Sequence, residues 1–229
     1  MKNTLFALIA MLMFCGCSDA SSSLEDGDGN TRNEEDFVET GTWVTSHFVT
    51  NYIVPNAIAT DRMYDGTILI SFEGDDHDTT GKTLSEMAKY FTELYGDTSY
   101  EGAVYPGAFS ALAYPIDKAT ISCDKDFDAE HPAGEPLDDI VRFDFVTCYD
   151  FIQNGYKLNA EYEYHEYYSL PLNEINADVT KLISLYFTND NNRELKFDSA
   201  PDVKGEYNFT LSMTINGRTL TTTFTHTFE

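Results

Sequence analysis

The stretch YNFTLSMTINGRTLTTTFTHTF, residues 207–228, decides the fold class of this chain. Large apolar side chains alternate with small polar ones on both sides of Asn216-Gly217, which is the spacing of half-buried strands. Asn-Gly suits a two-residue type I′ turn, because both turn positions need a positive φ. The stretch therefore predicts a β-hairpin with these pairs: Ile215 with Arg218, Met213 with Leu220, Phe209 with Phe224, and Tyr207 with His226. His226 then lies on the apolar face, where we expect a packed histidine bonded to a neighbour rather than a ligand.

Shorter stretches of the same kind precede the hairpin. Strands are predicted where β-branched and aromatic residues predominate or alternate with polar ones, at 42–54, 67–72, 111–123, 140–149 and 158–168. Pro55 is expected to end the first of these strands, and Pro115 to bend the third.

One segment has helical spacing instead. Its apolar residues are Leu84, Met87, Ala88, Phe91 and Leu94. Thr83 and Glu86 are spaced as a capping box, and Gly96 supplies a stop signal. We predict a helix over about 84–95.

These elements predict a mainly β domain over residues 37–229, an antiparallel β-sandwich of immunoglobulin-like type with one α-helix. The alternative is two small β-rich halves that meet near residues 96–111, a stretch that contains Gly, Pro and Ala.

The composition of the chain limits the classes of partner that it can bind. The 229 residues include 39 acids against 14 bases, a formal net charge of -25, and 14% of them are aromatic. This aromatic content favours a folded chain over a disordered one. A surface this acidic repels phosphate groups. We therefore predict no nucleic-acid partner, and anionic lipid surfaces are poor candidates.

The N-terminus predicts export. Lys2 precedes an apolar run over residues 5–14 that is too short to span a bilayer as a helix, so residues 1–16 are predicted to be a signal peptide. Gly16-Cys17 resembles the end of the lipobox of bacterial lipoproteins, which implies that the sulfur of Cys17 carries diacylglycerol. The alternative is a conventional signal peptide followed by a free cysteine. Residues 17–36 are nearly free of large apolar side chains and are predicted to be an acidic, flexible tether.

Acids close behind Cys17 resemble the surface-export signals of Bacteroidota lipoproteins, and the segments 124–139 and 149–156 resemble parts of uncharacterised members of that group. The resemblance covers about one fifth of the chain. We predict an outer-membrane lipoprotein with exposure at the cell surface, although Asp19, directly behind Cys17, would mean retention at the inner membrane in enteric bacteria. The resemblance itself implies secretion and a β-rich domain. It implies no activity and no catalytic residues.

Two cysteines, Cys123 and Cys148, lie near the ends of neighbouring predicted strands. In an exported protein they either form a disulfide or remain two buried thiols, and the sequence does not separate these alternatives.

The loop predicted at 74–83 ends in Gly-Lys-Thr like a phosphate-binding loop, but Asp76 stands where that motif needs Gly, so we reject nucleotide binding. His77 lies among three aspartates of this loop, and we expect an exposed polar loop in preference to a cation site. Farther on, strand alternation would place Glu161, Glu163 and His165 in one row. Such a row is either a catalytic or metal-binding set or the solvated face of a strand, and the solvated face is the commoner case.

A calcium-loop pattern is the candidate for a cofactor. Asp124, Asp126 and Asp128 occupy its first, third and fifth positions and Glu135 the twelfth. Ala129 replaces the glycine of the turn, and the flanking segments predict strands instead of the helices of an EF-hand. A calcium site and a solvated acidic turn both remain open.

Three classes of function follow. The first is a non-enzymatic envelope or surface protein that binds a glycan, a peptide or an envelope protein partner. The second is a hydrolase that uses carboxylates, for which the sequence offers no nucleophile elbow, zinc motif or acid pair. The third is a structural subunit of a surface assembly joined through sheet edges. The first class is the one we predict, with no catalytic residue assigned.

Overall fold

The structure, a computed structural model, describes residues 43–63, 66–81, 83–104, 109–161, 163–185 and 193–229. This part of the chain is mainly β, as predicted. Its strands are β1 (Trp43–Thr45), β2 (Asn51–Arg62), β3 (Ile68–Asp78), β4 (Gly102–Val104), β5 (Ser110–Leu112), β6 (Ile116–Cys123), β7 (Val141–Thr147), β8 (Glu166–Pro171), β9 (Arg193–Phe197), β10 (Gly205–Ile215) and β11 (Arg218–Phe228). Its helices include α1 (Glu86–Tyr95), α2 (Tyr149–Gln153) and the short 3-10 helix η2 (Leu172–Glu174). The predicted signal peptide, Cys17 and the tether lie outside the described residues.

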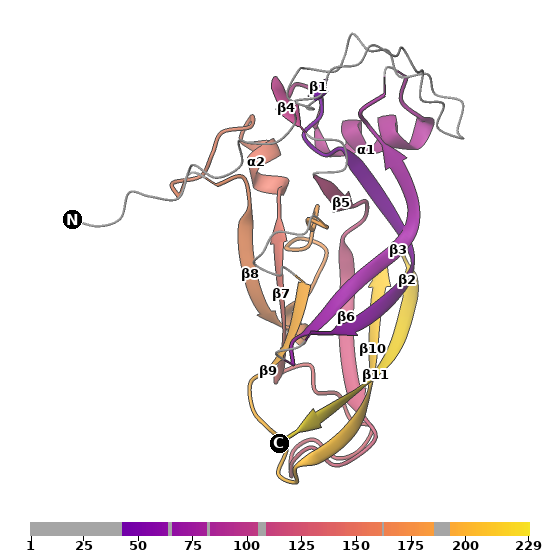
Figure 1. The fold of residues 1–229 in the computed structure, drawn as a ribbon, viewed down its shortest axis with the longest axis vertical. Coiled ribbons are helices and arrows are strands. Elements are labelled where there is room, and N and C mark those ends of the chain that lie inside the picture. Colours follow the sequence, from indigo (N-terminus) through magenta and orange to yellow (C-terminus); the bar gives the residue numbers. More distant parts are fainter. Residues whose placement is uncertain (1–42, 64–65, 82, 105–108, 162, 186–192) are drawn as a thin grey trace, which may run out of the picture. The chain divides into compact units, whose positions relative to one another are not determined.

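Two larger sheets and one short strand pair organise the described residues (Figure 1). The six-stranded sheet has the order β5-β2-β3-β9-β7-β8, and its pairings are antiparallel except for the parallel pair of β5 with β2. The three-stranded sheet, β11-β10-β6, is antiparallel throughout, and β1 pairs antiparallel with β4. The predicted preference for antiparallel strands is confirmed.

The C-terminal hairpin has the register that its sequence predicts. β10 and β11 pair Ile215 with Arg218, Met213 with Leu220, Phe209 with Phe224, and Tyr207 with His226. Asn216 and Gly217 have φ values of 50° and 70°, as a type I′ turn requires. On the other side of β10, β6 completes the sheet.

One hydrophobic core cluster contains buried side chains from both larger sheets. Phe143 and Phe145 of the six-stranded sheet and Ile121, Phe209 and Leu211 of the three-stranded sheet all belong to it. Each of these side chains is at most 1% exposed. Burying one such side chain contributes about 1.5–3 kcal/mol, so this cluster is the main source of stability.

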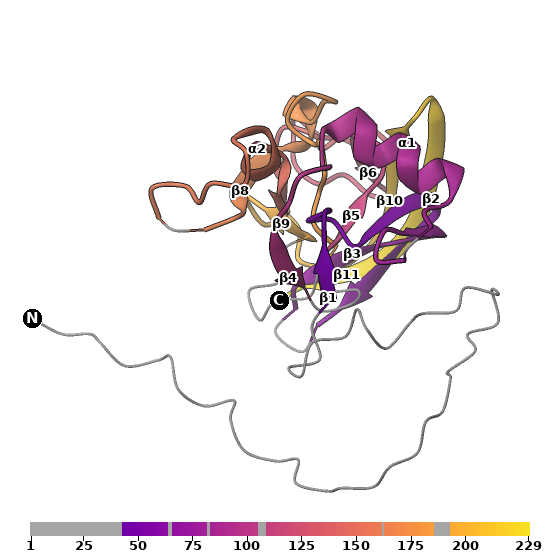
Figure 2. The ribbon, with the colours of Figure 1, turned by 90° about the horizontal axis from the view of Figure 1, so that it is seen from above.

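A second cluster lies where the helices pack against β2. Phe48, Tyr52, Phe91 and Phe151 are among its buried members, and the Tyr52 ring stacks on Phe91 at 5.4 Å between centroids. Figure 1 shows α1 and α2 near the same end of the strands, and Figure 2 views this end from above. The side-chain amide of Gln153 on α2 donates to the carbonyl of Tyr95 on α1 at 2.7 Å, which ties the two helices together.

The predicted boundaries of β2 and β3 are wrong. β2 continues through Pro55, where the pairing with β3 becomes irregular, as expected of a residue that has no N–H to donate. β3 continues to Asp78, so residues 74–78 belong to a strand and not to the predicted loop. Their partner is the start of β2, and the Asn51 amide donates to both carboxylate oxygens of Asp76 at 2.7 and 2.9 Å. This partner is far away in sequence, which is why the local pattern failed.

The predicted helix is present, but its start and its buried face differ. Ser85, not Thr83, is the N-cap, and its hydroxyl accepts from the Ala88 amide at 3.1 Å. Gly96 ends the helix in the left-handed conformation, as predicted. The buried residues are Ala88, Phe91, Thr92 and Tyr95, whereas Met87 and Leu94 are 38% and 51% exposed.

Further along, the predicted strand 111–123 is two strands on either side of Pro115, β5, which starts one residue earlier, and β6; β7 lies within the predicted strand 140–149. The helix α2 was not predicted, since its five residues are too few for a periodic pattern. The described residues among 158–165 do not form a strand. The Asn159 side chain accepts from the backbone amides of Glu161 and Glu163, both at 2.9 Å, and closes a turn, so β8 starts only at Glu166.

Candidate functional site

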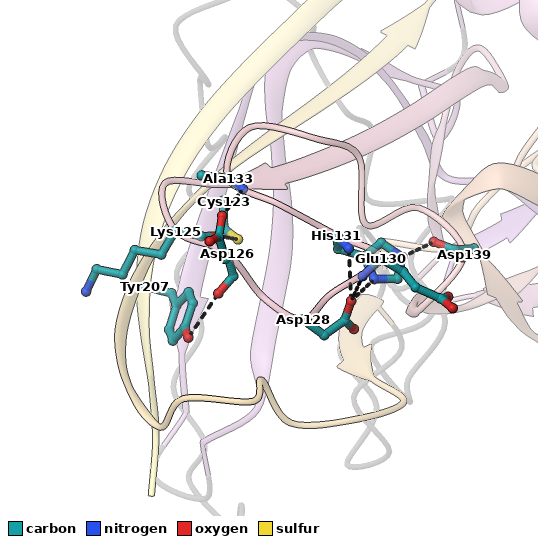
Figure 3. Close-up of polar contacts among 9 residues, drawn as sticks. All are labelled: Cys123, Lys125, Asp126, Asp128, Glu130, His131, Ala133, Asp139 and Tyr207. Atoms are coloured by element: carbon teal, nitrogen blue, oxygen red, sulfur yellow. Dashed lines mark hydrogen bonds and ion pairs between the residues drawn. The ribbon is translucent and has the colours of Figure 1, made fainter.

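The acidic connection between β6 and β7 is organised around His131 (Figure 3). One oxygen of Asp128 accepts from the backbone amides of Glu130 and His131 at 2.8 and 2.9 Å, and lies 2.8 Å from Nδ1 of His131. Nε2 of the same ring lies 3.1 Å from Asp139. His131 is only 8% exposed, so a buried imidazole bridges two carboxylates of this loop.

These contacts change the ionisation of the loop. Burial of the imidazole opposes its protonation, but the hydrogen bonds to Asp128 and Asp139 outweigh this effect and raise the pKa of His131. Partial burial also opposes ionisation of Asp128, yet the hydrogen bonds from His131 and the amide of Glu130 lower the pKa of that carboxyl group. His131 therefore stays protonated, and Asp128 stays ionised, over a wider pH range than the same side chains would in free solution.

The carboxylates of the calcium pattern already have protein partners. Asp126 accepts from the amide of Ala133 at 2.8 Å, and Asp124 accepts from the backbone and side-chain amides of Asn208 at 2.9 and 2.7 Å. Glu135 is exposed. Within the described residues, no group of three or more His, Cys, Asp or Glu side chains is placed to hold a metal ion. The calcium site remains a prediction. The sequence pattern did not single out His131, whose ring contacts both Asp128 and Asp139.

In the structure, Cys123 and Cys148 are free cysteines and both are buried. Cys123 belongs to the cluster between the larger sheets, and its thiol donates to the carbonyl of Lys125 at 3.0 Å. Cys148 belongs to the cluster around the helices. Burial raises the pKa of both thiols, which disfavours the reactive thiolate.

Asp97 is the most enclosed carboxyl group of the described residues, with no exposed surface. One of its oxygens accepts from the amide of Phe48 at 2.8 Å and the hydroxyl of Tyr156 at 3.0 Å. The other accepts from the amide of Val49 at 2.9 Å and the hydroxyl of Tyr52 at 3.3 Å. Burial raises the pKa of Asp97, although these amide hydrogen bonds oppose the rise. Because no surface of Asp97 reaches solvent, we assign it a structural role.

A cavity of about 370 Å³ lies beside α2. It is lined by α2, by the chain that follows it and by the first residue of β8, through these side chains: Asp150, Phe151, Gln153, Asn154, Lys157, Asn159, Glu163, Tyr164, His165 and Glu166. This cavity was not predicted, because it depends on the helix α2 and on the turn that replaces the predicted strand.

Aromatic rings form one part of the cavity wall. The rings of Tyr164 and His165 lie 4.4 Å apart, and Tyr164 also contacts Phe151 at 6.2 Å between centroids. His165 is 7% exposed, and its Nε2 atom is buried without a hydrogen-bond partner among the described residues. Burial lowers the pKa of His165 to about 4, so the imidazole is neutral at pH 7.

Polar groups form the rest of the wall. The lining contains three carboxyl groups, those of Asp150, Glu163 and Glu166, and one ammonium group, that of Lys157. Asn159 adds an amide that already donates to Glu166 at 3.4 Å. The cavity therefore combines flat apolar rings with many hydrogen-bonding groups and a negative balance of charge.

The predicted row of Glu161, Glu163 and His165 is not a row in the structure. Glu163 and His165 line the cavity together, but Glu161 is exposed and does not. His77 lies on β3 opposite Tyr52, and its ring is 5.8 Å from that of Phe91. It is half-buried on a strand, not exposed in a loop.

Comparisons of the chain with protein-family models, with curated proteins and with solved structures gave no match. None of the described helices is long and apolar enough to cross a membrane.

Proposed function

We propose that this protein is a lipid-anchored protein of the bacterial cell envelope, and that its β domain binds a glycan in the cavity beside α2. The anchor is the lipid on Cys17, followed by the tether of residues 17–36, which places the domain at the outer membrane with exposure at the cell surface. We assign the domain to the immunoglobulin-like β-sandwiches, on the basis of one core that contains side chains of both larger sheets.

The composition of the cavity carries the proposal for the ligand. Sugar rings present C–H groups on their faces and hydroxyls around their rims. The rings of Phe151, Tyr164 and His165 can pack against the C–H faces of a sugar. The amide and carboxyl groups of the lining can form hydrogen bonds with its hydroxyls. The volume of about 370 Å³ lies within the range of small-molecule sites.

A glycan array followed by calorimetric titration tests this proposal. Lys157 lines the cavity and is exposed, so Lys157→Trp is expected to fill it without disturbing the core. Lys118→Trp, at an exposed position on β6, is the matched control. We expect a glycan whose binding is weakened at least about tenfold by Lys157→Trp and is unchanged by Lys118→Trp.

Two results would oppose the proposal. A glycan bound equally by the parent and both variants would place the site elsewhere on the protein. A parent that binds no glycan of the array would remove the glycan from the proposal, and release of shortened sugars during the titration would favour the hydrolase alternative.

The anchor has its own test. In cells that export the full chain, the mature N-terminal peptide is expected to begin at Cys17 and to carry the mass of its acyl groups. Cys17→Ser is expected to move the protein from the membrane fraction to the soluble fraction. Retention of the Cys17→Ser protein on the membrane would contradict the lipid anchor.

One observation favours the alternative of an assembly subunit. β11 is an edge strand of eleven residues, and it contains no Pro and no Lys. Such edges are usually protected against pairing with other chains. Sedimentation that shows a concentration-dependent oligomer, abolished by Thr223→Pro, would support assembly through β11, and a monomer at all concentrations would oppose it.

A further inference from the structure

A second cavity, of about 490 Å³, is lined in part by His226 and Phe228 near the C-terminus and shares no lining residue with the proposed glycan site. Figure 1 shows the ends of β9 and β11 in this region. The lining of this cavity comes from the start of β3 and from β9, both in the six-stranded sheet, and from β11 of the three-stranded sheet. The cavity therefore opens between the two larger sheets.

The walls of this cavity are largely apolar. Ile68 and Leu195, each 3% exposed, pair across β3 and β9 and belong to the core cluster between the sheets. Phe197 and Phe228 pack against the same cluster, with their rings 5.2 Å apart at 79°. An apolar body that enters here would extend the core, and burial of its surface would be favourable.

His226 supplies the polar feature of the cavity. Its ring stacks on Phe197 at 5.5 Å and meets Phe228 edge-on at 4.6 Å, so it is packed, as predicted from the hairpin register. The expected bond to a neighbour is missing at one nitrogen, because Nδ1 is buried and has no hydrogen-bond partner among the described residues. A buried nitrogen without a partner costs about 1–3 kcal/mol, which a ligand that bonds to it would recover.

The ring of His226 is uncharged at neutral pH. Burial lowers the pKa of His226, and the positive charge of Arg62 lowers it further. Nδ1 of a neutral imidazole either donates or accepts, depending on the tautomer, and a hydroxyl group pairs with both forms. A charged group would find less support, because the one ammonium group of the lining, Lys196, is already bonded to Asp144.

We propose that this cavity binds a small aromatic alcohol, a phenol in chemical class. Its ring lies against Phe197 and Phe228, and its hydroxyl forms a hydrogen bond with Nδ1 of His226. Aromatic walls favour an aromatic body, because rings gain from edge-to-face and offset contacts beyond the area that they bury.

Two matched probes test the proposal on the full chain, p-cresol and toluene, which differ by the hydroxyl alone. Binding is measured by calorimetric titration and by methyl shifts of Ile68 and Leu195. His226→Phe keeps a ring and removes the nitrogen. Ala200→Trp fills the cavity from an exposed position of its rim, and Ala129→Trp, exposed in the acidic connection, is the matched control.

We expect the parent and Ala129→Trp to bind p-cresol about tenfold more tightly than toluene, the value of one net hydrogen bond. His226→Phe is expected to lose this preference, and Ala200→Trp to lose binding of both probes. No binding of p-cresol at millimolar concentration, equal binding of the two probes by the parent, or unchanged binding in Ala200→Trp would overturn the proposal. If His226→Phe does not fold, the preference of the parent and the loss in Ala200→Trp still decide the result.

Discussion

Single residues carry much of the organisation at the helical end of the domain, and Asp97 is the clearest case. Its two oxygens accept hydrogen bonds from two backbone amides and two tyrosine hydroxyls. It thereby fixes the chain at Phe48 and Val49, which belong to the second core cluster. Nothing in the local sequence marks Asp97, because its four partners lie at least 45 positions away.

Asp97→Ala is expected to destabilise the protein strongly. The substitution leaves two buried amides and two hydroxyls without their acceptor, and each such group costs about 1–3 kcal/mol, so we expect a loss of at least about 3 kcal/mol. Denaturant unfolding measures the effect. Asp117→Ala, at an exposed position on β6, is the control and should change the free energy of unfolding by less than about 0.5 kcal/mol. Equal effects of the two substitutions would contradict the structural role of Asp97.

His131 predicts a pH dependence. Its pKa in the folded protein is raised above the ordinary value of 6.5, so its bonds to Asp128 and Asp139 stabilise the fold fully below pH 6.5. This contribution is lost as the pH rises through the raised pKa. The difference in free energy of unfolding between the parent and His131→Gln should therefore be largest near about pH 6 and shrink toward about pH 9.

The control for this pH series is Glu130→Gln, an exposed neighbour in the same loop. Its difference from the parent should stay constant over the same range, since this substitution removes neither hydrogen bond of the His131 ring. A difference for His131→Gln that does not change with pH would contradict the bridge between the two carboxylates.

Among the elements, α1 raises the question of which residue caps its N-terminus, Thr83 or Ser85. The spacing of Thr83 and Glu86 indicates a capping box, but the structure caps the helix with the hydroxyl of Ser85. Ser85→Ala is expected to lower the free energy of unfolding by about 1 kcal/mol, because the Ala88 amide loses its acceptor. Thr83→Ala should have little effect. If thermal or denaturant unfolding shows a larger loss of stability for Thr83→Ala than for Ser85→Ala, the helix is capped by Thr83 as the sequence pattern indicates.

The hairpin and β3 show what short-range signals can predict. The hairpin register follows from Asn216-Gly217 alone, since a two-residue turn leaves one pairing for every residue that follows. The length of β3 does not follow from its own acidic end, residues 74–78, because pairing with β2 keeps this segment extended. A strand whose partner is distant cannot be delimited from its own composition.

For the whole molecule, the two core clusters keep the cysteines apart. Cys123 and Cys148 belong to different clusters, both are buried, and burial raises the pKa of both thiols. We expect neither cysteine to react with iodoacetamide in the folded protein and both to react after unfolding without reductant. Peptide mapping by mass spectrometry measures this, and a linked pair of peptides that contain Cys123 and Cys148 would contradict it.

The sequence by itself determined the mainly β class, the hairpin with its register, and a helix predicted at about 84–95 that the structure has at Glu86–Tyr95. Each of these depends on residues that are close in the chain, where turn geometry, strand alternation and helical periodicity act directly. Only the tertiary structure decided the six-stranded order, the contacts of Asp97 and His131, and the two cavities. The cavity near Phe228 collects side chains from three separate strands, and the cavity near His165 depends on a helix and a turn too short to leave a periodic pattern. Such sites arise from packing between segments whose contacts no local pattern encodes.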